Sequence, residues 1–273
     1  MHEAPIIQLG GLNIDLSIVL MLIVSCIVVF IIARLAVRNL SVENPGKMQN
    51  FLEWLVEFVR GLSNSTMDWK KGKPFISLAL TLIMFIFVSN MLGLPFGVVT
   101  GYHDASKAEI FGKPIVSVTE TLEKLHQQHP DQEAEVEVAW WKSPTADANA
   151  SMALAIMVFL LSHALGIFKN TKAYFKHYVH PYPFFLPINL IETFSKPLTH
   201  GMRLFGNIFA GEVLIAVILK LTSLGPAGGV FSVLGLIVWQ GFSIFVGTIQ
   251  AFVFTMLTLL YISQTYAVGH DHD

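Results

Sequence analysis

Charged residues and cysteine are both scarce in this sequence. Asp, Glu, Lys and Arg make up 13% of the 273 residues, against 53% that are hydrophobic, and the net charge is −2. A protein that binds nucleic acid presents a basic patch to the phosphates, so this composition argues against a nucleic-acid partner. The single cysteine, Cys26, lies in an apolar run, which excludes a disulfide framework and a thiolate metal site.

Signatures of catalysis are missing as well. The sequence has no nucleophile–base arrangement, no phosphate-binding loop and no spacing typical of a zinc site. The final residues "HDHD" are of metal-ligating types, but a solvated tail explains them better. We therefore expect no enzyme active site, no cofactor and no metal in this chain.

Long uncharged runs are abundant, and they predict an all-α polytopic membrane protein. A helix needs about 20 apolar residues to cross a bilayer. The first run has no positively charged segment before it and is followed by Arg34 and Arg38, which predicts a retained span and not a cleaved signal peptide. Within a single membrane domain, 1–273, we predict five membrane-embedded helices, over residues 12–34, 75–99, 148–169, 188–224 and 230–268.

Residues 46–64 predict an amphipathic helix on the membrane surface, because their apolar run is too short to span the bilayer. Charged residues recur at helical spacing on one face of this helix: Glu53, Glu57 and Arg60. Apolar residues cover the opposite face: Phe51, Leu55, Phe58, Val59 and Leu62.

The last two predicted helices form a hairpin, because only "GPAGG", residues 225–229, separates them. A continuous helix over 230–268 would be about 58 Å long at about 1.5 Å per residue. The hydrocarbon core is only about 30 Å thick, so this helix must be steeply tilted. A steeply tilted pair of long helices indicates a surface that wraps around another component of the membrane.

The charges of the loops predict the orientation. Lys and Arg flank the connections after the first and third spans, whereas residues 100–147 hold nine acids against four lysines. The positive-inside rule therefore places the N-terminus and the acidic loop 100–147 outside the cell, and the C-terminus in the cytoplasm.

Arg203 and Glu212 are charged residues inside the fourth span. An arginine at the centre of a bilayer-spanning helix costs about 3 kcal/mol, so such residues are usually functional. Glu212 lies nine residues further along, about 180° around an ideal helix, so the two side chains cannot pair directly. Two structural alternatives remain open. Arg203 could pair with a carboxylate elsewhere in the fold, and Glu212 could snorkel to the outer interface.

Other polar residues lie near the Arg203 face. On the same helix His200 and Asn207 fall close to that face. Glu192 falls nearly on it if the helix continues through Pro197. The final helix carries a polar stripe toward its partner, formed by Gln240, Ser243, Gly247, Gln250 and Thr258.

Gln250 belongs to the only polar stripe on an otherwise uncharged helix. A guanidinium has five donors and no acceptor, so it needs carbonyl oxygens or water. We therefore expect Gln250 to lie within hydrogen-bonding reach of Arg203. The alternative is that Gln250 and the small residues only pack the two helices together.

Two segments carry a family resemblance: "MRLFGNIFAGE", residues 202–212, and "GTIQAFVFTMLTLLYIS", residues 247–263. They closely resemble the a subunit of bacterial F-type ATP synthases, the stator component of the membrane proton motor, in a form similar to that of Bacillus. The segments "NPGKMQNFLEWLVEFV", "FVSNMLGLP" and "WWKSPTADANASMALA" extend the likeness over most of the chain. Residues 102–138 depart from the pattern and look like an acidic insertion in the outer loop.

The resemblance implies a site for proton translocation. In this family the tilted hairpin lies against a rotating ring of c subunits. The arginine, here Arg203, faces the ring carboxylates and separates two aqueous half-channels. Glu212 matches the acidic or histidine position of the outer half-channel, and Glu192 matches an inner-channel acid.

The resemblance also assigns polar positions and partners. Asn207 and Gln250 match polar positions near the arginine, and Ser243 stands where some relatives hold a His or Glu paired with the outer-channel group. The implied partners are the c-subunit ring, the b-subunit peripheral stalk and the remainder of the ATP synthase, with lipid around the helices and protons as the transported ion.

The main hypothesis is therefore a non-catalytic, proton-translocating stator subunit of an ATP synthase in a bacterial cell membrane. A secondary transporter that uses Arg203 for an anionic substrate is the alternative. A membrane subunit of a respiratory complex is a third hypothesis, but it requires paired haem-ligating histidines. His163 and His200 do not form a convincing pair.

Overall fold

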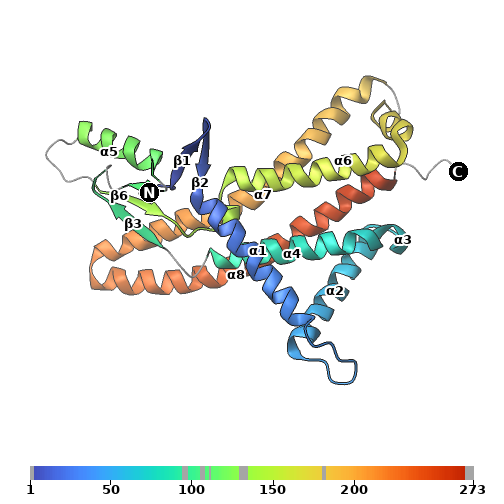
Figure 1. Ribbon diagram of the computed structural model, residues 1–273, viewed down its shortest axis with the longest axis horizontal. Coiled ribbons are helices and arrows are strands. Elements are labelled where there is room, and N and C mark those ends of the chain that lie inside the picture. The colour runs from blue at the N-terminus through green and yellow to red at the C-terminus, as the bar shows by residue number, and fades with distance from the viewer. Residues whose placement is uncertain are drawn as a thin grey trace.

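The structure is a computed structural model that describes residues 3–93, 98–104, 108–110, 112–128, 135–179 and 183–267. Within these residues five helices are long and apolar enough to cross a membrane. The prediction of an all-α polytopic membrane protein is confirmed. The five helices, shown in Figure 1, are α1 (Leu16–Ala36), α4 (Ile76–Leu92), α6 (Ala148–Val179), α7 (Leu186–Lys220) and α8 (Pro226–Ala267).

A β-hairpin precedes α1 and delays its start relative to the predicted residue 12. Strands β1 (Ile6–Leu9) and β2 (Leu12–Asp15) pair antiparallel. Gly10 and Gly11 join them with φ angles of 58° and 86°, which favour glycine. The Asp15 carboxylate then accepts hydrogen bonds from backbone N–H groups of the first turn of α1, which fixes the start of the helix.

Helix α2 (Lys47–Thr66) is amphipathic, as the sequence predicts. Its buried side chains Leu55 and Val59 belong to one core cluster with residues of α4 and α8, whereas Phe51 and Trp54 are exposed. Helices α1 and α2 diverge from the loop that joins them and form a V in the lower part of Figure 1. Two short elements then lead into α4: α3 (Trp69–Gly72) and η1 (Lys73–Phe75).

Helix α6 continues beyond the predicted end of its span at residue 169. Charged residues end a hydrophobic run, but they do not end a helix. The Lys169 ammonium lies over the ring of Tyr266 on α8, 3.3 Å from its centroid, in a cation–π contact. This contact attaches the polar extension of α6 to the end of α8. A single turn, η4 (Pro183–Phe185), precedes α7.

The acidic loop 100–147 contains a small folded unit with its own core, which we call the cap. The core side chains Ile115, Val118 and Val138 are fully buried. Glu3 exchanges backbone hydrogen bonds with residues 137 and 139 and so attaches the segment before β1 to this unit. The cap consists of two antiparallel strand pairs and a helix: β3 (Val99–Tyr102) with β6 (Val136–Ala139), β4 (Glu109–Ile110) with β5 (Lys113–Pro114), and α5 (Val116–Gln128).

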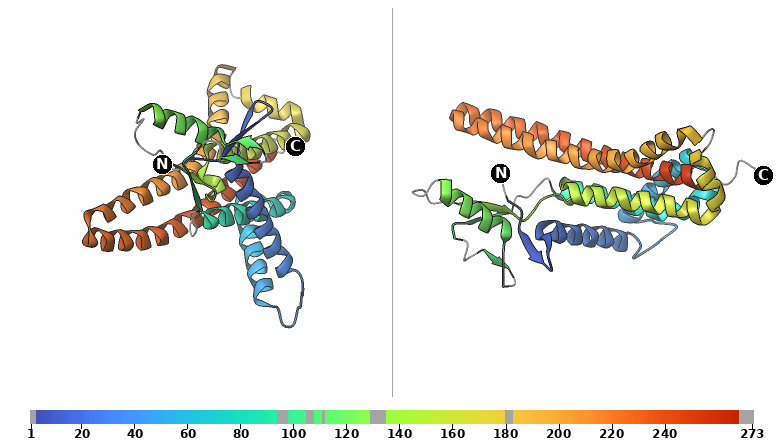
Figure 2. Two further views of the ribbon diagram at one scale, coloured as in Figure 1. Left: turned by 60° about the vertical axis from the view of Figure 1, so that its left-hand side comes forward. Right: turned by 90° about the horizontal axis from the view of Figure 1, so that it is seen from above.

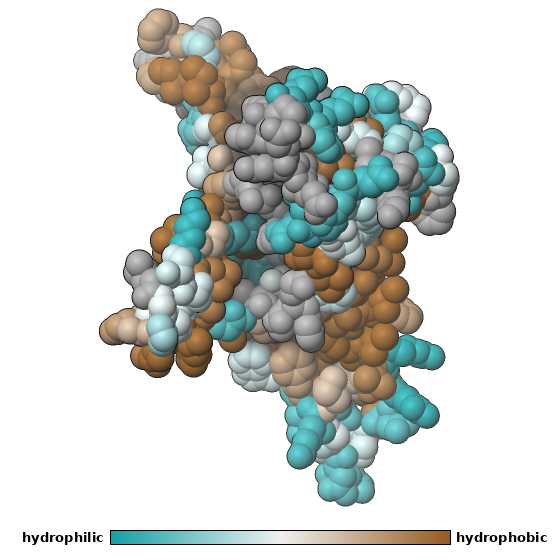
Figure 3. All heavy atoms as spheres, turned by 90° about the vertical axis from the view of Figure 1, so that its left-hand side faces the viewer, coloured by the Kyte–Doolittle hydropathy of each residue, from teal (hydrophilic) through white to brown (hydrophobic). Residues whose placement is uncertain are grey.

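The molecule has two distinct ends. The right-hand view of Figure 2 shows the cap strands, α5 and the N-terminus at one end, and the C-terminal ends of α1, α6 and α8 at the other. On the face drawn in Figure 3, hydrophobic side chains cover the body of the helices, and hydrophilic side chains gather on the cap and on the loop between α1 and α2. This is the distribution expected of a protein whose middle zone meets lipid.

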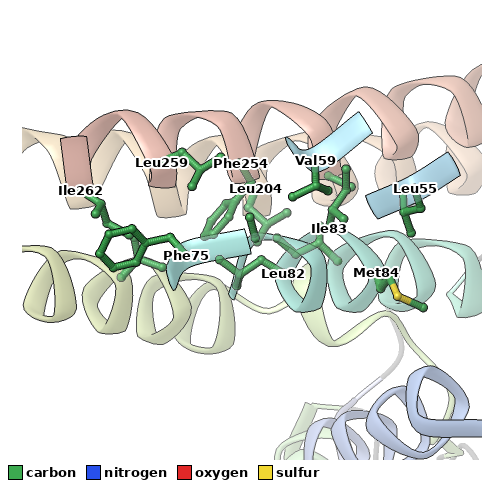
Figure 4. Packing of buried hydrophobic residues seen from close by; sticks show 14 residues of the cluster. Leu55, Val59, Phe75, Leu82, Ile83, Met84, Leu204, Phe254, Leu259 and Ile262 are labelled. Atoms are coloured by element: carbon green, nitrogen blue, oxygen red, sulfur yellow. The ribbon is translucent and has the colours of Figure 1, made fainter. Parts of the chain in front are cut away.

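The core lies along α8, which contacts α4, α6 and α7. Figure 4 shows its side chains between α2, α4, α7 and α8, and Leu204, Phe254 and Leu259 are almost completely buried. The close approach of α6 and α7 requires Gly201, because a Cβ atom there would lie 3.1 Å from the Cα atom of Met152 and against its sulfur. Small residues have this role in many membrane helix interfaces.

Helices α7 and α8 form the predicted long hairpin, with 35 and 42 residues. The turn consists of η5 (Leu221–Leu224) and Gly225, whose φ of 88° favours glycine. Pro197 lies inside α7 and has no N–H to donate, and α7 is visibly bent in Figure 1. The helix nevertheless continues through Pro197, so Glu192 and Arg203 belong to one helix.

Candidate functional site

Arg203 lies on the part of α7 that faces away from the rest of the chain. The buried residues Pro197, Gly201 and Leu204 mark the packed face of this helix, whereas Arg203 is exposed. Within the described residues its side chain forms no ion pair and no hydrogen bond. The described part of the chain therefore does not supply the intramolecular carboxylate partner that was considered for Arg203.

The exposed surface of the hairpin is largely apolar on both helices, from the level of Arg203 toward the hairpin turn. Such a surface is suited to lipid or to another apolar helix and leaves the guanidinium without acceptors. Large exposed side chains on α7 include Met202, Phe209, Val213 and Val217, and those on α8 include Phe231, Leu234, Val238, Phe242 and Phe245.

A cleft with a mixed apolar and polar lining lies between α4, α7 and α8, beside the segment that leads to η3 (Pro144–Ala146). Its volume is about 70 Å³, and one water molecule needs roughly 10–15 Å³ of such space, so several waters fit. The cleft also comes within one helical turn of Arg203, because Asn207 follows the arginine at i+4. The polar residues that line it are Asn90, Ser143, Asn207, Glu212, Trp239 and Ser243.

The wall of the cleft opposite α7 is a buried hydrogen-bond network centred on Asn90. The Asn90 Nδ2 group donates to the backbone oxygen of Gly247 on α8 at 3.0 Å, and Asn90 Oδ1 accepts from Thr145 Oγ1 at 2.7 Å. Ser143 Oγ donates to the backbone oxygen of Ser89 at 2.9 Å. The network joins α4, α8 and η3, and it fixes the Asn90 amide because both of its ends are bonded.

Glycines bring the walls of the cleft close together. A Cβ atom at Gly247 would lie 3.3 Å from Cβ of Asn90, and one at Gly93 would lie 2.6 Å from Cβ of Ser143. Across the hairpin, a Cβ at Gly211 would touch the Trp239 ring at 3.4 Å. A larger residue at Gly93 or Gly247 would change the shape of the cleft, whereas a Cβ at Gly211 would make an ordinary van der Waals contact.

The structure brings three of the predicted site residues together, since Glu212, Asn207 and Ser243 all line the cleft. Glu212 forms no ion pair within the described residues. Glu212 is an exposed residue that lines a cavity able to hold water. This position is compatible with both alternatives, a role in the cleft and snorkelling to the interface.

His200 and Gln250 are buried inside the protein and do not line the cleft. His200 is 2% exposed and stacks on Phe254, with 3.7 Å between ring centroids. Gln250 is 5% exposed, and its Nε2 atom has no hydrogen-bond partner within the described residues. The expected hydrogen bond, from the Arg203 guanidinium to the Gln250 side-chain oxygen, is not formed within the described residues: Gln250 is buried, whereas Arg203 is exposed.

Glu192 lies near the other end of α7, where it is exposed. It forms an ion pair with Lys196, one turn further along, at 3.3 Å. Lys196 in turn donates to Gln264 Oε1 on α8 at 3.4 Å. Glu192, Lys196 and Gln264 thus form a short series of polar contacts between α7 and α8, and none of them lines the cleft.

Asn90, Ser143 and Thr145 are site residues that the sequence analysis did not select. A signal was present, because Asn90 is a polar residue within the uncharged span 75–99 and the other two lie in the quoted segment "WWKSPTADANASMALA".

Among the described residues no group of His, Cys, Asp or Glu is arranged to hold a metal ion.

The fold and the cleft define a class: a polytopic membrane protein with a polar site on a long helical hairpin. Residues 18–263 match the family model described as "ATP synthase A chain". The chain is 46% identical to ATP synthase subunit a of Anoxybacillus flavithermus over 272 residues, 99% of each chain. It is 43% identical to that of Priestia megaterium and 41% identical to that of Bacillus subtilis, again over 99% of each chain. The chain belongs to the ATP synthase A chain family.

These comparisons confirm the resemblance and correct one detail of it. The alignments with the Anoxybacillus and Priestia proteins cover 99% of both chains in 272 residues. A segment as long as 102–138 therefore cannot be an insertion relative to these relatives.

Proposed function

We propose that this chain is the membrane stator subunit through which protons pass in an ATP synthase. Membership of the family makes it a non-catalytic membrane subunit of that complex. The main support for a role in proton passage is the environment of Arg203. It is an exposed arginine in a membrane helix and has no partner among the described residues. Such a residue requires an anionic or hydrated partner from outside, and a carboxylate on a ring of c subunits meets that requirement.

The polar cleft serves as the outer half-channel. It lies at the end of the molecule that carries the cap, which the positive-inside rule places outside the cell. Water in the cleft exchanges protons with Glu212, and Asn207 continues the polar lining to within one turn of Arg203. A proton from outside then reaches the ring surface at the level of the arginine.

Arg203 controls the charge of the ring carboxylate that faces it. An unpaired carboxylate in lipid is costly, so the ring groups are neutral while they face lipid. Beside a guanidinium the charged form is favoured, and the carboxylate releases its proton to a half-channel. Arginine suits this role because it stays protonated when desolvated, whereas lysine loses its charge more easily.

The two half-channels must open to opposite sides of the membrane for this proton exchange to drive rotation of the ring. A proton that crosses a potential of 100 mV releases about 2.3 kcal/mol, and the sum over several protons turns the ring. Glu192, Lys196 and Gln264 are the polar residues of α7 and α8 that support an inner path. Arg203 lies between this group and the cleft along α7, where it prevents direct passage.

The decisive experiment replaces Arg203 in the assembled complex. We expect Arg203→Ala and Arg203→Lys to abolish ATP-driven proton pumping in inverted membrane vesicles while the subunit still assembles, because the role is electrostatic at an interface. Arg38→Ala is the matched control, since Arg38 is exposed in the loop after α1. Coupled pumping by the Arg203→Ala complex would contradict the proposal. Anion transport by the purified chain alone in liposomes would favour the secondary transporter instead.

A further inference from the structure

An ion pair joins the N-terminal end of α1 to the segment between the cap and the cleft. Lys142 Nζ lies 2.8 Å from Asp15 Oδ2, and the two side chains are 22% and 12% exposed. The other oxygen of Asp15 accepts from the backbone N–H and hydroxyl of Ser17, at 2.9 and 2.6 Å. Asp15 is thus held by α1, and it holds the lysine in turn.

Lys142 is also held close to the cleft by its neighbours in sequence. Trp141 Nε1 donates to the backbone oxygen of Leu92 at 2.7 Å, and Ser143 is bonded to Ser89 and lines the cleft. The backbone around Lys142 is therefore fixed along the C-terminal turns of α4. Only the long lysine side chain can change direction.

Glu212 is a second carboxylate within the electrostatic reach of Lys142. Ser143, the residue directly after Lys142, lines the same cleft as Glu212, and within the described residues the two charged groups do not pair. A lysine between two carboxylates pairs with the one that is better placed. Asp15 has the advantage because its carboxylate is already oriented by the first turn of α1.

We infer that Asp15 is a positioning residue for the outer half-channel. It keeps the Lys142 ammonium paired away from Glu212, so that Glu212 stays unpaired and exchanges protons with water in the cleft. Without Asp15, the ammonium turns toward Glu212, and the new ion pair holds that carboxylate ionised and obstructs the cleft. This inference rests on the proposed function of the cleft.

The test measures passive proton flux through the membrane sector in vesicles stripped of the catalytic part, under a fixed membrane potential. We expect Asp15→Asn to lower the flux by at least about threefold. Without its partner in a mostly buried ion pair, the Lys142 ammonium would pair with Glu212 instead. Lys142→Gln should leave the flux unchanged. The double variant Asp15→Asn with Lys142→Gln should restore it, because no ammonium is left to reach Glu212.

Asp147→Asn is the matched control. Asp147 caps α6 through hydrogen bonds to the backbone N–H groups of Asn149 and Ala150, but it pairs with no lysine within the described residues. Asparagine is as good a cap as aspartate, so neither substitution removes a helix cap. The amount of each variant in purified complexes shows whether assembly is intact.

Four outcomes decide the matter. Rescue of the flux in the double variant supports the inference when the Asp15→Asn complex contains the normal amount of subunit and unfolds at the normal temperature, because relief of an unpaired buried lysine would then be excluded as the cause. An unchanged flux in Asp15→Asn, or a double variant as slow as the single one, overturns it. Glu212→Gln serves as the independent check: if that variant conducts normally, the proposed function of the cleft has failed, and not merely the inference about Asp15.

Discussion

The two halves of the α7–α8 hairpin carry similar polar residues but hold them in different ways. In the half near the cap, Glu212 lines a cleft that can hold water and forms no ion pair within the described residues. In the other half, Glu192 is paired with Lys196, and His200 is buried between aromatic rings. A carboxylate beside water can exchange a proton with it, whereas Glu192 is engaged by a neighbouring ammonium. The difference supports the proposal that the outer half-channel runs through the half near the cap.

The largest effect on this comparison is expected from Glu212→Gln. Glutamine keeps the size of the side chain and the shape of the cleft but cannot carry a proton, so passive proton flux should fall by about tenfold or more. Glu212→His should retain much of the flux, because histidine also exchanges protons. Flux is measured in stripped vesicles under a fixed potential. A normal rate in the glutamine variant would indicate that Glu212 only snorkels toward the interface.

A smaller loss is expected from Asn90→Leu, which breaks the wall of the cleft without touching α7. The substitution removes the Asn90 acceptor of the Thr145 hydroxyl, which keeps only its contact with Ser143 Oγ, and the Asn90 donor to the backbone oxygen of Gly247. We expect a destabilisation of about 1–3 kcal/mol, and the polar lining is replaced by an apolar side chain. We expect proton flux to fall by about threefold and the midpoint of thermal unfolding of the purified complex to drop.

Asn50→Leu is the control for Asn90→Leu, because Asn50 is exposed on α2 and lines no cleft. It should change neither the flux nor the unfolding temperature. If Asn90→Leu behaves in the same way, the network around Asn90 is not part of the proton path.

The smallest effect should come from Glu192→Gln. Its pair with Lys196 is a surface i,i+4 pair, of a kind that contributes only about 0.3–0.5 kcal/mol, and Glu192 is not in the cleft. We expect passive flux within about twofold of the unmodified complex. A loss as large as that of Glu212→Gln would show that the Glu192 carboxylate itself must exchange protons in the inner path, and not only line it.

Much of the fold could be predicted from the sequence because the membrane imposes simple rules. Uncharged runs predicted the five helices, "GPAGG" predicted the hairpin, and helical spacing placed Asn207 and Ser243 on the facing sides of α7 and α8. The position of Glu212 in the cleft was implied by the family resemblance. These features depend on local sequence, which explains why no structure was needed to find them.

The rest depends on contacts between residues that are far apart in sequence. Asn90 and Gly247 are separated by 157 positions, and periodicity gives the face of a helix but not its partner. The same limit explains Gln250, which lies on the predicted polar stripe but is buried in the packed interior and not bonded to Arg203. The cap was missed because its strands are short and its charged composition resembles that of a loop.

The unpartnered arginine also has a consequence for biogenesis. In the proposed assembly, the newly inserted chain exposes the Arg203 guanidinium in a membrane helix before it meets the ring, at a cost of about 3 kcal/mol. Binding to a carboxylate-bearing partner would remove this cost, so the lone subunit would be less stable than the assembled one. We therefore expect a cell that makes this chain in excess of such a partner to accumulate little of it.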